Sequence, residues 1–231
     1  KLFSDLIEEK DLAVRGMALC EQGINHKPLC DRLALYYARN SGHRYAAIFS
    51  QLLPMVTTVV VCATKNQFAQ EDSEINRVGE YLRERNILVI ENDILDGGWR
   101  EPLKGLPAQK TGVFISFEGE IHAILDDIVS IAINNKYFTM ASNVHAIHQD
   151  VDFALGYSEQ AAIGEVAQKV EEYLKGAPLS NDPVWLPLSL HVNMTRLGRY
   201  TDIVSQIERL VLEEEESALK VHIHSTKEAV R

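Results

Sequence analysis

The residues Val56-Thr57-Thr58-Val59-Val60-Val61-Cys62 form an unbroken run of apolar and β-branched side chains. A strand with water on one face alternates apolar and polar residues, whereas a continuous β-branched run is typical of a strand buried on both faces. Such strands belong to parallel sheets that helices cover on both sides. This run therefore predicts the first strand of a buried parallel sheet.

Strand-like and helix-like segments alternate after this run. Apolar residues recur with helical spacing over 71–85 and 121–134, and a short helix is expected around Leu103. Four further apolar runs are typical of strands: 87–90, 113–117, 137–140 and 152–156. Because this alternation is the pattern of βαβ units, we expect an α/β fold with an open, mostly parallel sheet and helices on both faces.

The segments on either side of this alternation favour helices. No β-type run occurs before Val56, and apolar residues there recur at helical spacing up to Pro54. A long helix is expected over 158–174, followed by an extended stretch over 184–192. From Thr201 the helical spacing returns, and four consecutive glutamates follow. We therefore expect a helical N-terminal segment (1–55), an α/β domain (56–200) and a helical acidic tail (201–231).

Composition excludes several classes of protein. The 231 residues include 33 acidic and 23 basic side chains, and this net charge of −10 repels phosphate backbones, so we expect no nucleic-acid partner. No apolar run approaches the roughly 18 residues that a membrane helix needs. The three cysteines are too few for a disulfide scaffold; Cys62 is expected in the core, and a Cys20–Cys30 pair in an oxidising compartment stays open.

Polar residues follow the predicted strands. In open α/β sheets, ligands bind beyond the carboxyl ends of the strands. Thr64 and Asn66 follow the first strand, Ser116 and Glu118 end the third, and Ser142 follows the fourth. We expect these five residues to bind a small ligand, although a polar loop can also simply face water.

Motifs for catalysis are missing from the sequence. It contains no GxxxxGK[ST] phosphate loop, no GxGxxG dinucleotide turn and no GxSxG nucleophile elbow. We therefore expect no catalytic residue and no cofactor. His145 and His148 are spaced HxxH, and His222 and His224 are spaced HxH, which puts two rings on one face of an extended segment. The sequence places no third ligand beside them, so we expect no metal site, and we expect His222 and His224 to be solvated.

Three pieces of the sequence carry a family resemblance. Leu52-Leu53-Pro54 stands before the first strand, Tyr173-Leu174-Lys175-Gly176-Ala177-Pro178 ends the long helix, and residues 190–198 read LHVNMTRLG. In order and spacing these pieces resemble the periplasmic-binding-protein-like (type I) family. They are most similar to ABC transporter substrate-binding proteins of the tryptophan/tyrosine-type uncharacterised group. The resemblance runs from about Pro54 to Tyr200 and concerns mainly the second of the two lobes of this family.

The resemblance implies a function without catalysis. It implies a solute-binding protein or domain, outside the cytoplasm (in the periplasm or at the cell surface), that binds a small molecule such as an amino acid and has an ABC permease as partner. In this family the loop after the third strand directs a polar or acidic residue at the ligand, and Ser116 and Glu118 stand there. A homodimer that completes the cleft stays open.

Two alternatives remain. One is a ligand-sensing domain of a signalling protein with the same ancestry, whose helical ends act on an output domain. The other is a flavodoxin-like enzyme that acts on a phosphorylated substrate through the loops around Lys65 and Ser142.

Overall fold

The computed structural model describes residues 41–70, 73–116, 121–157, 168, 171–172, 175, 188–212 and 219–225. Contacts group residues 40–156 and 188–231 into one compact unit, and 1–39 with 157–187 into another. Nearly all described elements belong to the first unit. The helices expected within 1–40, and most of the one expected over 158–174, lie outside the described residues.

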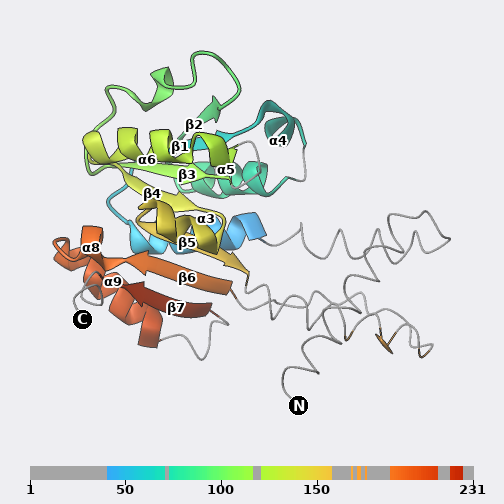
Figure 1. The fold of residues 1–231 in the computed structure, drawn as a ribbon, viewed down its shortest axis with the longest axis vertical. Coiled ribbons are helices and arrows are strands. Elements are labelled where there is room, and N and C mark those ends of the chain that lie inside the picture. Colours follow the sequence, from blue (N-terminus) through green and yellow to red (C-terminus); the bar gives the residue numbers. More distant parts are fainter. Residues whose placement is uncertain are drawn as a thin grey trace. The chain divides into compact units, whose positions relative to one another are not determined.

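The first unit is built on a seven-stranded sheet with the strand order β2-β1-β3-β4-β5-β6-β7 (Figure 1). Strands one to five are β1 (Thr58–Ala63), β2 (Leu88–Asp93), β3 (Thr111–Ile115), β4 (Phe138–Ala141) and β5 (Phe153–Tyr157). β1 pairs in parallel with β2 and β3, and β4 pairs in parallel with β3 and β5. The expected parallel sheet is confirmed, and its first four strands begin within about two residues of the predicted positions.

The last two strands run the other way. β6 (Leu188–Asn193) and β7 (Leu219–His224) pair in parallel with each other. Their arrows point opposite to that of β5 in Figure 1, and Asn193 N, at the end of β6, donates a hydrogen bond of 2.9 Å to Asp152 O, just before β5. The sheet is therefore mixed rather than wholly parallel.

The tail differs from the sequence prediction. Helix α9 (Thr201–Leu212) occupies its first part as expected, but Leu219–His224 is the strand β7 instead of helix. Leu219 is buried there, because a strand beside β6 extends the sheet and covers this apolar side chain. Both α9 and β7 belong to the same compact unit as β1, so this unit continues past the boundary expected at residue 200.

Helices cover both faces of the sheet. On one face, Tyr45 and Phe49 of α3 (Ser41–Leu52) reach Phe114 and Gly112 of β3, and α3 packs against α5 (Glu74–Glu84). On the other face lies α6 (Leu125–Asn134), which follows the short 3₁₀ helix η2 (Ile121–Ala123). Two further 3₁₀ helices, η1 (Glu101–Leu103) and η3 (Val144–Gln149), border this second face.

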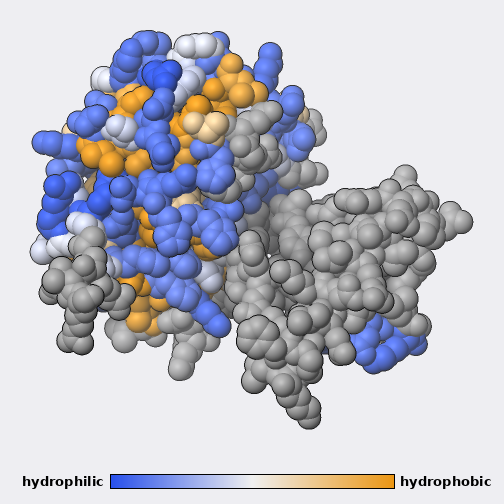
Figure 2. Space-filling view, in the orientation of Figure 1, coloured by the Kyte–Doolittle hydropathy of each residue, from blue (hydrophilic) through white to orange (hydrophobic). Residues whose placement is uncertain are grey.

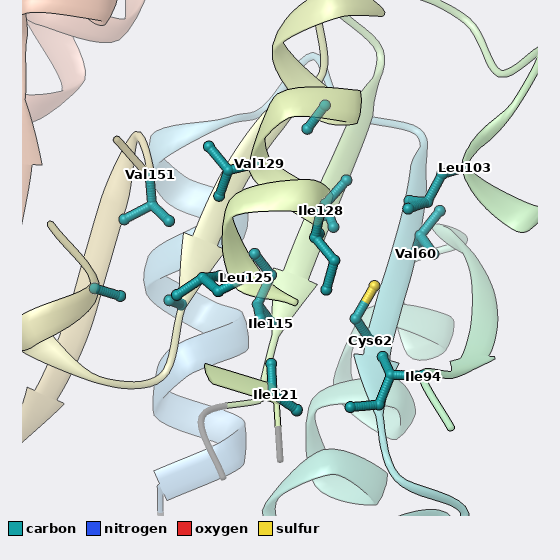
Figure 3. Close-up of a cluster of buried hydrophobic side chains, with 14 of the residues drawn as sticks. Val60, Cys62, Ile94, Leu103, Ile115, Ile121, Leu125, Ile128, Val129 and Val151 are labelled. Carbon is teal, nitrogen blue, oxygen red and sulfur yellow. The ribbon is translucent and has the colours of Figure 1, made fainter. Parts of the chain in front are cut away.

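The core beneath α6 explains why the sheet is stable. In Figure 3, Val60 and Cys62 of β1 point to the same side as Ile115 of β3, toward Leu125 and Ile128. All five side chains are fully buried. Each such side chain contributes about 1.5–3 kcal/mol of hydrophobic free energy relative to exposure. The continuous apolar run that predicted β1 is therefore explained by cores on both of its faces.

Large apolar side chains that reach the surface are scattered. Figure 2 shows mostly hydrophilic side chains in this view, with apolar ones between them over the part that carries β2 and α6. Those exposed by more than a third among the described residues are Leu88, Leu95, Ile133, Val211 and Ile223. Single apolar residues of this kind are ordinary on soluble surfaces and do not define an interface.

Candidate functional site

The carboxyl ends of β1, β3 and β4 lie side by side along the carboxyl-terminal edge of the sheet, because these strands are parallel neighbours. The backbone ladder continues past each strand end. Ser116 N donates to Cys62 O over 3.0 Å, and Ser142 N donates to Ile115 O over 3.0 Å. The loops that follow β1, β3 and β4 therefore begin from fixed positions at this edge.

The loop after β1 turns directly into the short helix α4 (Lys65–Ala69). Thr64 is its N-cap and is only 4% exposed. Thr64 Oγ1 accepts a hydrogen bond from Gln67 N over 3.4 Å, and Gln67 Oε1 accepts one from Thr64 N over 2.9 Å. This reciprocal pair is a capping box, which satisfies two backbone donors and fixes both side chains.

Gln67 also joins this loop to the next one. Its Nε2 donates a hydrogen bond to Ser116 Oγ at 2.5 Å, while its Oε1 stays on the backbone of Thr64. Ser116 is 3% exposed, so the amide of Gln67 bridges two buried polar residues at the edge of the sheet. We name Thr64, Gln67 and Ser116 the polar bridge.

A carboxylate lies beside the polar bridge. Asp93 ends β2, and its Oδ1 accepts hydrogen bonds from Lys65 N over 3.2 Å and from Leu95 N over 3.1 Å. Asp93 therefore occupies the backbone N–H of Lys65 at the start of α4, a donor that a bound phosphate would need. This negative charge disfavours a phosphorylated substrate at the loop around Lys65.

Asn92 and Cys62 are buried beneath this edge. Asn92 is buried, and its Nδ2 donates to Trp99 O over 2.9 Å and contacts Cys62 Sγ at 3.5 Å. Burial raises the pKa of the Cys62 thiol to about 12, against a smaller opposing effect of Asn92. The thiol is therefore protonated and unreactive at neutral pH.

The loop after β4 adds further polar groups. Ser142 is half-buried, and Asn143 Oδ1 accepts a hydrogen bond from His145 N over 2.8 Å, which caps η3. This edge thus presents hydroxyl, amide and carboxylate groups from four separate strands. Such a set can bind a small polar molecule through hydrogen bonds.

Three of the five predicted site residues lie at the same edge of the sheet in the structure. Thr64 and Ser116 are joined through Gln67, and Ser142 follows the neighbouring strand at the same edge. Asn66 is exposed on α4, outside the hydrogen bonds that connect Thr64 to Ser116. Glu118 lies outside the described residues.

The sequence prediction missed Gln67 and Asp93 as members of the site. The spacing Thr64-x-x-Gln67 is a capping-box pattern, so the sequence held a signal for Gln67. Asp93 stands in the polar stretch after the second predicted strand, but its contact with Lys65 comes from the pairing of β1 with β2.

Two hollows lie away from this edge. One, of about 600 Å³, is lined by residues that include Ser50, Tyr81 and Arg85; the other, of about 420 Å³, lies between α6 and η3. Neither includes the polar bridge or Ser142. Within the described ranges, no three His, Cys, Asp or Glu side chains are arranged to hold a metal ion. Among the helices described, none has the length and apolar character to cross a membrane.

Comparison with solved structures shows the fold. The chain is similar to a conserved domain protein from Vibrio cholerae (TM-score 0.52, 10% identity, 71% of this chain and 58% of the other). It is also similar to an ABC domain in complex with L-Trp from Streptococcus pneumoniae (TM-score 0.52, 13% identity, 72% and 60%). A third similar structure is the ligand-free, open form of a substrate-binding protein with adhesive properties from Clostridium difficile (TM-score 0.52, 14% identity, 78% and 58%).

These likenesses establish a periplasmic-binding-protein-like fold for the chain, as the sequence resemblance implied. The chain spans less than two thirds of the length of each of these proteins. No protein-family model matches the sequence, and no curated protein is significantly similar to it.

Proposed function

We propose that this chain is a solute-binding protein, or a domain of one, that binds a small molecule such as an amino acid without transforming it. The site is the edge of the sheet that carries the polar bridge, Ser142 and Asp93. The observation that supports it best is the hydrogen bond from Gln67 to Ser116, which holds two loops together before any ligand arrives. Preorganised polar groups of this kind lower the entropic cost of binding.

The chemistry of the edge suits an amino acid. The carboxylate of Asp93 provides an acceptor for an ammonium group, and the hydroxyls of Ser116 and Ser142 offer neutral hydrogen bonds. The ABC domain from Streptococcus pneumoniae was solved with L-Trp, which supports aromatic amino acids as the first ligands to test. An ABC permease as partner and a site of action outside the cytoplasm belong to the same proposal.

The affinity of the site depends on how much of the ligand surface the protein buries. Good small-molecule sites bury roughly 70–90% of the ligand surface. A ligand that contacts only the polar edge keeps much of its contact with water. We therefore expect weak binding where the edge stays open to water, and tighter binding where a second lobe or a second copy covers it.

Calorimetric titration with aromatic and branched amino acids tests this proposal. The variants Ser116→Ala and Gln67→Ala should weaken any binding that occurs, because they remove the two ends of one hydrogen bond. Ser130→Ala is the matched control, since this exposed serine lies on α6, away from the polar bridge. Binding that all three variants leave unchanged would place the site elsewhere.

A further inference from the structure

Five of the eight histidines of the chain gather where η3 meets the last two strands. They are His145 and His148 on η3, His191 on β6, and His222 and His224 on β7. β6 contacts η3 directly, and the register of the two strands sets His191 opposite His222. We name these five residues the histidine cluster.

Four of the five rings of the cluster contact one another. His191 Nδ1 lies 2.9 Å from His224 Nε2, within hydrogen-bonding distance. The His191 ring also stacks on His222, with the ring centroids 4.5 Å apart and the planes inclined by 27°. His148 meets the His224 ring edge-on, with a centroid distance of 6.5 Å. These contacts connect β7 to both β6 and η3.

This arrangement depends on the protonation of the rings. In a hydrogen bond between two imidazoles, one nitrogen donates and the other must accept, so at least one ring is neutral. When both rings are protonated, every ring nitrogen carries a hydrogen, and the bond between His191 and His224 is lost. The two positive charges then repel each other at close range as well.

Burial and the neighbouring charges both lower the pKa values of His191 and His224. Burial lowers the pKa of His191 to about 4, assisted by His222, His224, His148 and His145. The pKa of His224 is also lowered, first by burial and then by His148 and His222. Among the described residues, the charges responsible therefore belong to other histidines.

The other charged groups near the cluster lie on α8, β7 and α9, and on α6, whose Asp126 lines one hollow together with His148. Arg196 of α8 (Met194–Leu197) donates to Asp150 O, at the end of η3, and pairs with the carboxylate of Asp152. β7 itself carries the exposed Lys220. The charged residues of α9, which contacts β7, are Asp202, Glu208 and Arg209.

We propose that the histidine cluster is a pH-sensitive latch, which fastens the edge strand β7 to β6 and η3 at neutral pH and releases it under mildly acidic conditions. β7 is suited to such release because it is the last strand in the order of the described strands, where it pairs with β6 alone. Near its end Ile223 is 57% exposed, so little apolar burial holds this part of the strand. The polar bridge lies on other strands, so this proposal does not depend on the proposed ligand site.

The direction of the effect follows from the lowered pKa values. Histidine in an unfolded segment has a pKa of about 6.5, above that of His191 in the folded protein. Between about pH 6.5 and 4 the released strand therefore binds more protons than the latched one. The stability of β7 is fully present above this window and falls as the pH falls through it.

Hydrogen exchange of the full chain, measured from pH 7.5 to 5.0 with a chelator present, tests the latch. After correction for intrinsic exchange rates, amides 219–224 should lose protection by on the order of tenfold or more, the effect of one pKa unit. Amides of the central strand β1 should keep theirs. Unchanged protection of 219–224 over this range would overturn the proposal.

Variants identify the rings responsible. In the double variant His191→Gln and His224→Gln, neither side chain can take up a proton, so the pH dependence of β7 protection should disappear. His43→Gln is the matched control, since His43 lies on α3 and contacts Tyr81 instead. If the double variant misfolds, an NMR titration of the histidine rings in the unaltered chain decides. A His191 ring that titrates at the ordinary histidine value contradicts the latch.

Discussion

Gln67 donates a hydrogen bond from Nε2 to Ser116 Oγ over 2.5 Å, although the two residues lie 49 positions apart in the sequence. The same side chain accepts from the backbone of Thr64 through Oε1. One amide thus fixes the loops that follow β1 and β3 relative to each other. The proposed binding site depends on this contact, because both loops supply groups to it.

Replacing Gln67 by alanine should lower the free energy of unfolding by about 1–2 kcal/mol, because Thr64 N loses its acceptor and the buried Ser116 hydroxyl loses its donor. The neighbouring variant Asn66→Ala should change it by less than about 0.5 kcal/mol, as is usual for an exposed side chain. Urea denaturation compares the two. Equal effects would mean that the polar bridge does not stabilise the edge.

Replacing Arg196 by methionine should destabilise the protein by about 3 kcal/mol at pH 7, since it leaves the buried carboxylate of Asp152 without its ion-pair partner. Arg196 Nε lies 3.3 Å from Asp152 Oδ1, and Thr139 donates to Oδ2 from both its backbone and its hydroxyl.

The loss of stability in the Arg196→Met variant should depend on pH. Burial raises the pKa of Asp152, and the positive charge of Arg196 opposes this rise. Without Arg196 the pKa of Asp152 rises further. The carboxyl of Asp152 in the folded variant therefore keeps its proton to a higher pH than the same carboxyl in the unfolded chain. Its deficit relative to the unaltered chain should therefore be largest at pH 7 and shrink toward pH 4. Denaturation curves at several pH values measure the difference, and a deficit that grows in acid would contradict the assignment.

The approach of α3 to the sheet requires glycine at position 112. A Cβ atom there would lie 2.2 Å from Phe49 Cζ. Gly112→Ala should therefore destabilise the protein by about 1–3 kcal/mol, the usual cost of overpacking a core. At Gly97 a Cβ meets no atom within 4 Å, so Gly97→Ala is the control and should show no comparable loss. Thermal unfolding of both variants checks the packing of α3.

Cys62 should be inert in the folded protein. Its thiol is buried, and its pKa is raised to about 12. In a chain that carries Cys20→Ser and Cys30→Ser, a thiol reagent at pH 8 should react only at the rate at which the protein opens, and fully in denaturant. Rapid reaction of the native protein would show that β1 is not a central buried strand.

The sequence was sufficient to predict the five parallel strands. Each begins as a short apolar run, and β1, β3 and β4 are buried along their whole length, as Val60 and Ile115 show in the core under α6. The direction of β6 could not be predicted, because it is set by where the chain re-enters the sheet beside Asp152. β7 was missed because His222 and His224 make it polar, and polar residues at the end of a chain resemble a solvated tail.

The candidate site was predictable only in outline. The rule that ligands bind at the carboxyl ends of strands selected Thr64, Ser116 and Ser142, which the structure places at one edge. The role of Gln67 depends on a contact between loops that are distant in sequence, so strand ends alone cannot reveal it.

The most direct test of the central claim is a two-dimensional NMR titration of the ¹⁵N-labelled chain with L-tryptophan and, in parallel, with L-leucine. The proposed function predicts saturable shifts, for at least one of the two, at the amides of Thr64, Gln67, Ser116 and Ser142, and their loss in Ser116→Ala. Saturable shifts that instead centre on Ser50 and Tyr81, beside the larger hollow, or an absence of shifts at the polar bridge at millimolar concentrations of both amino acids, would contradict it.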